Sequence, residues 1–495
     1  MTKGIGILIL SAMKNSSLAS LIKALKIFLF ALGGLAGVLL LAALAVMLFV
    51  DVDAYKPRAE AAASDALGMN VTVEGRLRIG FIPGLHVTLE NVRIRNRGTE
   101  IAFVKEAELA IELLPLFQQE LRYGSVALKG ARISIERGRD GRYNYEKLPE
   151  AKKTIHALNL QKVTFAELIV AYADKESGSG FEARNCKGEL THMRHPGGAP
   201  FLMRLSLSGQ FTCSEVRGKD TTASDLKFSV DATEGVFDFK PVTMRIFGGQ
   251  GSGSMRMDYS AAVPVLHISY SLSKFRTEEF FKALSSNKSV SGLMDFSTTL
   301  SMRGRTRVEL RQSANGEMSL SGMNLTLAGV DIDKQLSKYE SSQNFNLFDI
   351  SAVLFAGPIG LAVTKGYEFS SLAQQTGGST QIRTVVSKWK VEKGVAHARD
   401  VALATRENRL ALQGGLDFVN DEYDEVFVVL IDLNGCAKVR QKIRGPFSKP
   451  VVEKPNVVAS LAGPVLNLLS KARKLLPGTG KKCEVFYSGS VPPPK

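Results

Sequence analysis

Residues 266–272 read LHISYSL, and an apolar side chain stands at every second position of this stretch. The apolar members are Leu266, Ile268, Tyr270 and Leu272. Successive side chains of a β-strand point to opposite faces of the sheet, so a period of two predicts a strand that is apolar on one face and polar on the other. The stretch therefore predicts a half-buried strand.

The same alternation returns along most of the chain, at residues 71–79, 87–94, 107–113, 126–136, 201–208, 226–231, 242–246, 318–327 and 410–433. Its phase slips by one residue at Glu90-Asn91 and at Gly322, and such slips predict β-bulges. Residues 426–431 form a nearly continuous apolar run, which is typical of a strand covered on both faces. Because no strand–helix–strand rhythm is present, we predict a mostly β fold, a long bent or rolled antiparallel β-sheet groove with a few capping helices.

A sheet with one apolar face has to hide that face from water. A rolled sheet does so, and a sheet left partly open forms a trough for acyl chains. The inward side chains that we expect to line this groove are Leu109, Ile111, Met203, Leu205, Ile268 and Tyr270. About 430 residues at ~13–15 residues per strand and turn predict on the order of 30 strands, which would form a ribbon on the order of 145 Å long at ~4.8 Å per strand.

Three stretches depart from the strand pattern. Residues 54–68 are rich in Ala and predict a helix with Gly68 at its C-cap. An insert at residues 331–375 predicts a second helix, followed by the apolar run Ile350–Val363, which is too short to cross a membrane and either closes one end of the β body or contacts lipid. Residues 456–476 predict a basic amphipathic helix that either lies on a membrane surface or packs on its own domain.

Residues 27–50 read IFLFALGGLAGVLLLAALAVMLFV, a run of 24 residues without a charge. A helix of this length rises roughly 36 Å, enough to cross the ~30 Å hydrocarbon core of a bilayer. Residues 1–26 contain four lysines and no acidic residue, whereas Asp51 and Asp53 follow the run. The positive-inside rule therefore predicts an N-terminal transmembrane helix with residues 1–26 in the cytoplasm and the bulk of the chain outside it. A cleaved signal peptide is the alternative, but its apolar core would be shorter.

The composition narrows the class of partner. The net charge of +15 indicates either an acidic partner, such as anionic lipid headgroups, or a thin spread of charge over solvated strand faces. The chain contains no RNP, zinc-finger or helix-turn-helix pattern, so we expect no nucleic-acid partner.

The four cysteines are Cys186, Cys213, Cys436 and Cys483. An even number of cysteines in an oxidising compartment permits disulfides, and three pairings are possible. We favour the pairing of sequence neighbours, and the spacings do not resemble those of a zinc site.

Catalytic signatures are sparse. Gly249, Gly251 and Gly253 form GxGxG without a surrounding βα unit, so we interpret them as a β-turn rather than a phosphate loop. His192 and His195 lie near Cys186 in a loop rich in Pro and Gly, which is a weak case for a metal site. We therefore expect no enzyme activity, no cofactor and no metal.

Several short motifs follow the predicted membrane helix in a particular order. They are DVDAYKPRAEAAASDALGMN at 51–70, LLPL at 113–116, DGRYN at 140–144, FGG at 247–249, GEMSLSGMNL at 316–325 and IRGPFSKPVV at 443–452. In this order and behind a membrane anchor, they resemble the AsmA family of Gram-negative envelope proteins. The resemblance divides the β body into an N-terminal AsmA-like region, residues 51–240, and a C-terminal one, residues 241–455, before a helix and tail at 456–495.

The resemblance implies a single-pass protein of the bacterial inner membrane whose bulk lies in the periplasm. It implies a role in outer-membrane biogenesis, by binding or conducting phospholipid acyl chains in an apolar β-groove. A ribbon on the order of 145 Å is shorter than we expect a periplasm to be wide, so we expect an envelope protein partner at the C-terminal end or action near the inner membrane. The alternatives are a structural or regulatory envelope protein that affects outer-membrane protein assembly without carrying lipid, and a binding ectodomain for a soluble ligand.

Overall fold

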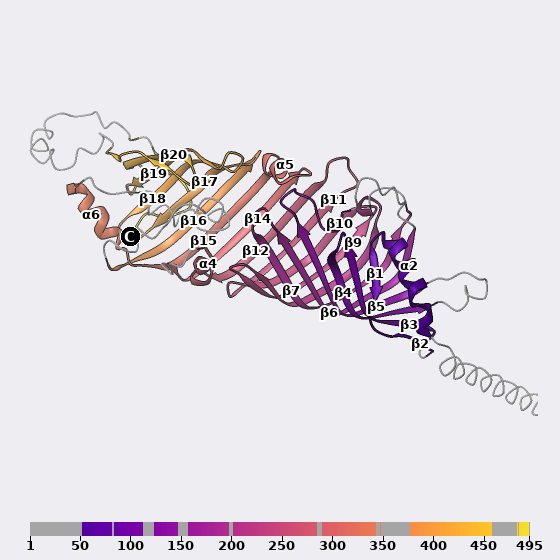
Figure 1. The fold of residues 1–495 in the computed structure, drawn as a ribbon. Helices are drawn as coiled ribbons and strands as arrows, with labels where there is room; N and C mark the ends of the chain where they lie inside the picture. The colour runs from indigo at the N-terminus through magenta and orange to yellow at the C-terminus, as the bar shows by residue number, and fades with distance from the viewer. Residues whose placement is uncertain are drawn as a thin grey trace, which may run out of the picture.

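The computed structural model describes residues 52–81, 84–111, 123–146, 157–197, 201–284, 290–342, 347, 377–457, 483 and 485–494. Within them, 22 strands form one sheet. The strands follow one another along the molecule, from β2 and β3 at one end to β20 at the other (Figure 1). A mostly β architecture built on one long sheet is confirmed.

The predicted membrane helix at 27–50 and the apolar run at 350–363 lie outside the described residues. So does the predicted amphipathic helix, apart from its first two positions. Within the described part of the chain, no helix is long and apolar enough to cross a membrane.

The strands of the sheet are β1 (Asn70–Val73), β2 (Leu77–Gly80), β3 (His86–Asn96), β4 (Thr99–Ile111), β5 (Tyr123–Arg137), β6 (Leu158–Asp174), β7 (Ser179–His195), β8 (Ser206–Gly218), β9 (Thr222–Thr233), β10 (Val236–Ile246), β11 (Gly249–Asp258), β12 (Val265–Arg276), β13 (Val290–Ser291), β14 (Leu293–Arg303), β15 (Asn315–Ala328), β16 (Ser379–Glu392), β17 (Val395–Ala404), β18 (Arg409–Asp417), β19 (Glu422–Ile431), β20 (Ala437–Pro446), β21 (Val451–Val452) and β22 (Asn456–Val457). The helices are η1 (Val52–Tyr55), α2 (Lys56–Leu67), η2 (Phe201–Met203), α4 (Thr277–Leu284), α5 (Arg307–Gln312) and α6 (Ile332–Ser342).

Both helices predicted around residues 54–68 and 331–342 are present as α2 and α6. Gly68 ends α2 in the left-handed conformation, with φ at 65°, and its amide donates to the Ser64 carbonyl at 2.7 Å. Glycine adopts this conformation without a steric penalty, which is why the C-cap could be predicted from sequence.

The expectation of a purely antiparallel sheet is wrong at one place, because β5 pairs with β6 in parallel. The connection between these strands runs from residue 138 to residue 157. It is long enough to return the chain to the end at which β5 began, as parallel neighbours require. The other neighbouring pairs are antiparallel, and β10 runs through the predicted region boundary at residue 240.

A line of residues with positive φ crosses the N-terminal strands and bends them; we call it the crease. Its members are Asn91, Gly130, Glu167, Asn185 and Asp225, with φ between 48° and 61°. The predicted slip at Asn91 is in the right place, but it is no bulge between β3 and β4. The ladder keeps its register from Glu90–Glu106 to Val92–Val104, so both strands change face together.

The crease gives both halves of each bent strand the same apolar face. Val104 and Ala107 lie on opposite sides of the crease on β4, yet both belong to one buried cluster. The side chains of Asn91, Asn185 and Asp225, at the crease itself, are exposed. The sheet is therefore folded with its apolar side chains inside and the crease residues outside.

Fewer strands are described than the roughly 30 expected from typical strand lengths, because individual strands are long. β6 and β7 have 17 residues each. The GxGxG residues lie within β11 and not in a turn, so that interpretation is wrong. A Cβ at Gly251 would lie 1.9 Å from the Tyr270 hydroxyl, so these glycines make room for a neighbouring side chain.

We expect Gly130→Val to lower the free energy of unfolding by about 1–2 kcal/mol more than Gly130→Asn. Both substitutions place a Cβ near that of Lys105, at 2.9 Å, so the difference between them reports the left-handed backbone, which Asn tolerates and Val does not. Denaturant unfolding of the purified protein measures both values. Equal losses for Val and Asn would show that the crease does not depend on this conformation.

Candidate functional site

One row of side chains runs across eighteen strands and is apolar throughout; we call it the apolar row. Each member faces the next across the ladder, from β2 to β20. The members are Ile79, Val87, Leu109, Val126, Val163, Leu190, Gly209, Val230, Phe239, Met255, Ile268, Leu300, Gly316, Val391, Ala396, Leu416, Tyr423 and Gly445. Seventeen strand spacings of ~4.8 Å make the row about 80 Å long.

The next row on the same face is also mainly apolar, with two hydroxyl groups, on Tyr270 and Thr298. From β3 to β17 its members are Leu89, Ala107, Leu128, Phe165, Gly188, Phe211, Phe228, Val242, Gly253, Tyr270, Thr298, Met318, Trp389 and Ala398. Two neighbouring rows without a charged side chain form a continuous apolar strip on the inner face of the folded sheet.

The opposite face is polar. Adjacent to Ile268 in the sequence, His267 faces Arg256 on one side and Ser301 on the other. Both His267 and Arg256 are exposed. In these central strands the sheet therefore separates an apolar inner face from a polar outer face, one residue apart along the strand.

A cavity of about 470 Å³ opens on β10–β15, and its lining includes Phe239, Met255, Ile268, Leu300 and Gly316. These five are consecutive members of the apolar row. The volume lies within the range of small-molecule sites. The lining also includes Asp238, Lys240, Arg256 and His267, so the cavity is an unfilled space in the middle of the row that polar side chains border.

The six side chains predicted to line a groove have different places. Leu109 and Ile268 are members of the apolar row, and Tyr270 is a member of the row beside it. Leu205 is buried, with 4% of its surface exposed, in a cluster with Val230.

The other two lie at the margins. Ile111 is the last residue of β4, beyond a register irregularity, and faces Tyr123. Met203 lies in η2 and not in a strand, which corrects the predicted strand over 201–208. Its carbonyl packs against the β9–β10 turn, where a Cβ on Gly235 would lie 2.5 Å away, so this segment follows the turn and β8 starts only at Ser206.

Four phenylalanines of the inner face were not singled out from the sequence. Phe165, Phe211, Phe228 and Phe239 form a chain of ring contacts with centroids 5.2–5.9 Å apart. Gly188 lies on β7, between the strands that carry Phe165 and Phe211, and a Cβ at this position would lie 2.3 Å from the Phe211 ring. Register brings these rings together, and no local sequence spacing reports it.

An ion pair joins two strand ends that lie far apart along the sheet. Arg307, at the start of α5, contacts the carboxylate of Asp174, at the end of β6. β6 and β14 are seven strand spacings apart, ~34 Å in a flat sheet. The sheet must therefore curl until the ends of these strands meet.

The Asp174 carboxylate is fully buried and well supplied with donors. It accepts from the amides of Glu176 at 2.9 Å and Ser177 at 3.2 Å, and from Arg137 at 3.3 Å. Burial raises the pKa of Asp174, but the amide donors, Arg137 and Arg307 outweigh it, so that the net pKa lies below its ordinary value. The ionised form is thus the one that the fold stabilises.

The apolar row changes character at β16. Most of its members from β2 to β15 are half-buried, whereas Ala396 and Leu416 are 0% exposed. Helix α6 contributes Ile332 and Leu336 to the same cluster. The Asp333 carboxylate accepts from Thr405 Oγ1 at 2.5 Å and Asn408 Nδ2 at 2.8 Å, which ties α6 to the β17–β18 turn.

The outer face is also covered here, by residues 485–491, which we call the strap. Tyr487 and Val491 pack on Ala402, Ala411 and Val429. The β19 run at 426–431 is therefore covered on both faces, as its sequence predicted.

The disulfides join Cys186 to Cys213 and Cys436 to Cys483, the pairing of sequence neighbours. Cys186 and Cys213 face each other across β7 and β8 in the buried N-terminal cluster. The second bridge ties the strap to the turn before β20. Within the described residues, no group of three or more His, Cys, Asp or Glu could hold a metal ion; His195 Nδ1 accepts from the Gly197 amide at 3.0 Å.

Comparison with protein families gives one finding. The sequence pattern of the AsmA family matches residues 22–196 and 203–401. The matched ranges include the apolar row from β2 to β17. A comparison with curated proteins finds no match.

We expect Asp174→Asn to destabilise the protein at pH 7 and to cost less and less as the pH falls. A carboxylate whose folded pKa is lowered contributes stability above its unfolded pKa, ~3.9, and loses it as the pH falls through the folded value. Thermal unfolding at pH values from 7 to 3 measures the gap, which is the difference in melting temperature between wild type and variant. Asp220→Asn, at an exposed turn position, serves as the control and should show no gap. A gap for Asp174→Asn that stays constant over this range would contradict the role of the ionised carboxylate.

Proposed function

This chain belongs to the AsmA family of envelope proteins, and from this premise we propose that it binds or conducts phospholipid acyl chains along the apolar row. It acts in outer-membrane biogenesis from an inner-membrane anchor, with the β body in the periplasm. The proposal includes no enzymatic step and no cofactor. The observation that carries it is a strip of two apolar rows, without a charge, across consecutive strands.

The length of the strip matters because of the energetics of a lipid tail. A tail that leaves a bilayer loses about 0.8 kcal/mol for each CH₂ group that meets water. A protein surface can accept the tail only if it offers apolar contact in place of the bilayer at every position that the tail occupies. A continuous apolar strip meets this condition, whereas a single unpaired charge in the strip would interrupt it at a cost of several kcal/mol.

The accessible part of the strip lies between β3 and β15. Beyond it, α6 and its neighbours fill the inner face. We place the lipid-binding segment in the first part, with Leu109 near one end and the cavity at Ile268 near the other. A row of about 80 Å also supports hand-over to an envelope protein partner at the C-terminal end.

The packed C-terminal third favours one alternative. A structural or regulatory envelope protein that affects outer-membrane protein assembly would need a rigid body and no open path for lipid. Under this alternative the inner face is simply a hydrophobic core.

We expect Ile268→Glu and Leu109→Glu each to reduce photocrosslinking of phospholipid to the purified protein about tenfold or more, because a carboxylate in the strip is desolvated by a bound tail. Ser271→Glu, three residues away on the outer face of the same strand and outside the cavity lining, is the matched control and should crosslink as wild type does. Unchanged thermal unfolding would establish that each variant folds.

An Ile268→Glu variant that folds and still crosslinks lipid as wild type does would contradict the proposal. Outer-membrane permeability in cells that carry the same variants distinguishes lipid binding from a purely structural or regulatory role. A purely structural role predicts no permeability change for a variant that folds.

A further inference from the structure

The register between β17 and β18 is irregular in the middle of the two strands. These strands pair from Val395–Asp417 to His397–Gly415 and again from Ala402–Ala411, but not in between. Residues 398–401 and 412–414 therefore have no ladder partner across this gap. Through this stretch β17 stays paired with β16 and β18 stays paired with β19, so the sheet is continuous and its surface is locally uneven.

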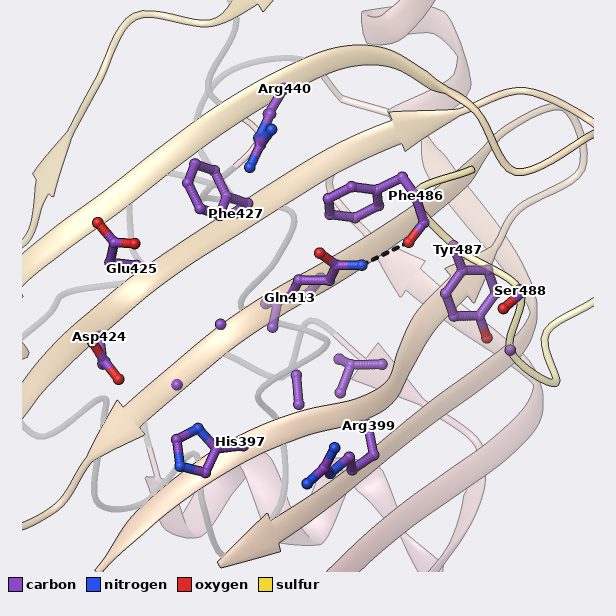
Figure 2. Close-up of a pocket in the computed structure, with 16 residues that line it drawn as sticks. His397, Arg399, Gln413, Asp424, Glu425, Phe427, Arg440, Phe486, Tyr487 and Ser488 are labelled. Carbon is purple, nitrogen blue, oxygen red and sulfur yellow. Dashed lines mark hydrogen bonds between the residues drawn. The ribbon is translucent and has the colours of Figure 1, made fainter. Parts of the chain in front are cut away.

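The gap forms the floor of a recess of about 700 Å³ on the outer face. Gly414 and Gly415 are among its lining residues, and Phe486, Tyr487 and Ser488 of the strap form one wall (Figure 2). Gln413 Nε2 donates to the Phe486 carbonyl at 2.7 Å, which holds this wall in place. The recess lies on the opposite face of the sheet from the apolar row, so a molecule bound in the recess does not contact the row.

Two guanidinium groups flank the recess from opposite sides, Arg399 on β17 and Arg440 on β20 (Figure 2). Arg440 lies 3.8 Å from the centre of the Phe427 ring, and stacking of this kind leaves the edge N–H groups free to donate. Within the described residues, neither guanidinium takes part in an ion pair. Both are therefore available to an anionic ligand.

The acidic side chains of the recess do not balance these charges. Glu425 is engaged by Lys442, with Nζ 2.8 Å from Oε1. Asp424 is the remaining carboxylate, at one end of the recess (Figure 2). With two guanidinium groups, Arg399 and Arg440, and one carboxylate without an ion pair, Asp424, the recess is richer in cations than in free carboxylates, and it selects for an acidic ligand.

The distance between the two arginines indicates the shape of that ligand. Three strand spacings of ~4.8 Å place the backbones of β17 and β20 ~14 Å apart. In an extended peptide at ~3.3 Å per residue, side chains at i and i+4 are ~13 Å apart and point to the same side. The strap shows that an extended segment fits across these strands, because Phe486 contacts β18 and the Tyr487 hydroxyl donates to Asp400 on β17 at 2.6 Å.

We propose that the recess binds an extended acidic peptide segment of a partner protein. The segment lies beside the strap and crosses β17 to β20. Its carboxylates, four residues apart, bind Arg399 and Arg440. The site recruits a partner to the C-terminal end of the molecule, independently of whether the inner face carries lipid.

The test uses the full chain in a non-ionic detergent at low salt and a fluorescein-labelled peptide, Ser-Glu-Ser-Thr-Ser-Glu-Ser, read by fluorescence anisotropy. We expect Arg399→Glu and Arg440→Glu each to weaken binding about tenfold. We expect Asp424→Asn to tighten binding. Arg383→Glu, an exposed arginine of β16 outside the recess, is the matched control and should bind as wild type does.

A second peptide has Lys at both Glu positions, and it should bind the Arg399→Glu variant more tightly than it binds the wild-type protein. Because a misfolded variant would not gain binding, this result separates a charge effect from a loss of folding. Four results would overturn the proposal. The first is that the Glu peptide does not bind the wild-type protein, and the second is that a peptide with Gln at both Glu positions binds as tightly as the Glu peptide. The third is that Arg383→Glu weakens binding as much as Arg399→Glu and Arg440→Glu do. The fourth is that equimolar free glutarate displaces the peptide, which would mark a site for small dianions.

Discussion

Register is the constraint on which the structure depends. Most strands from β2 to β16 alternate apolar and polar side chains, so a slip of one residue between two of these neighbours would put a polar side chain into the apolar row. The row stays apolar across eighteen strands, through the parallel pair β5–β6 and through the bulge in β10 between Phe239 and Val242. A sheet of this length separates two environments only because every pair of neighbours keeps the same phase.

The crease turns this two-faced ribbon into an enclosing one. A flat sheet would expose its apolar face, whereas strands bent at one line place both of their halves around a shared interior. Residues such as Asn91, Asn185 and Asp225 suit the left-handed backbone that the bend requires. The Asp174–Arg307 contact then closes part of the curl with a buried carboxylate, which is stable because two amides and two guanidinium groups compensate its lost hydration.

The two ends of the molecule differ in what they leave accessible. In the N-terminal and central strands, the inner face is half-buried and contains a cavity. In the C-terminal strands, α6 packs on the inner face and the strap packs on the outer one. The outer-face recess and the two guanidinium groups that flank it, those of Arg399 and Arg440, are found at this second end. The division is consistent with a body that holds a ligand along its length and meets a partner at its tip.

The amino-acid sequence by itself determined the strands around residues 87–94, 107–113, 126–136, 226–231 and 266–272, the faces of Leu109, Ile268 and Tyr270, the cap at Gly68 and the double cover of residues 426–431. Each of these is a local property, set by the identities of residues one to four positions apart. The tertiary structure alone decided which strands are neighbours, that β5 and β6 run parallel, that Met203 follows a turn, and that Asp174 meets Arg307 from 133 residues away. Register and curvature arise from contacts between distant segments, and the spacing of residues along the chain contains no record of them.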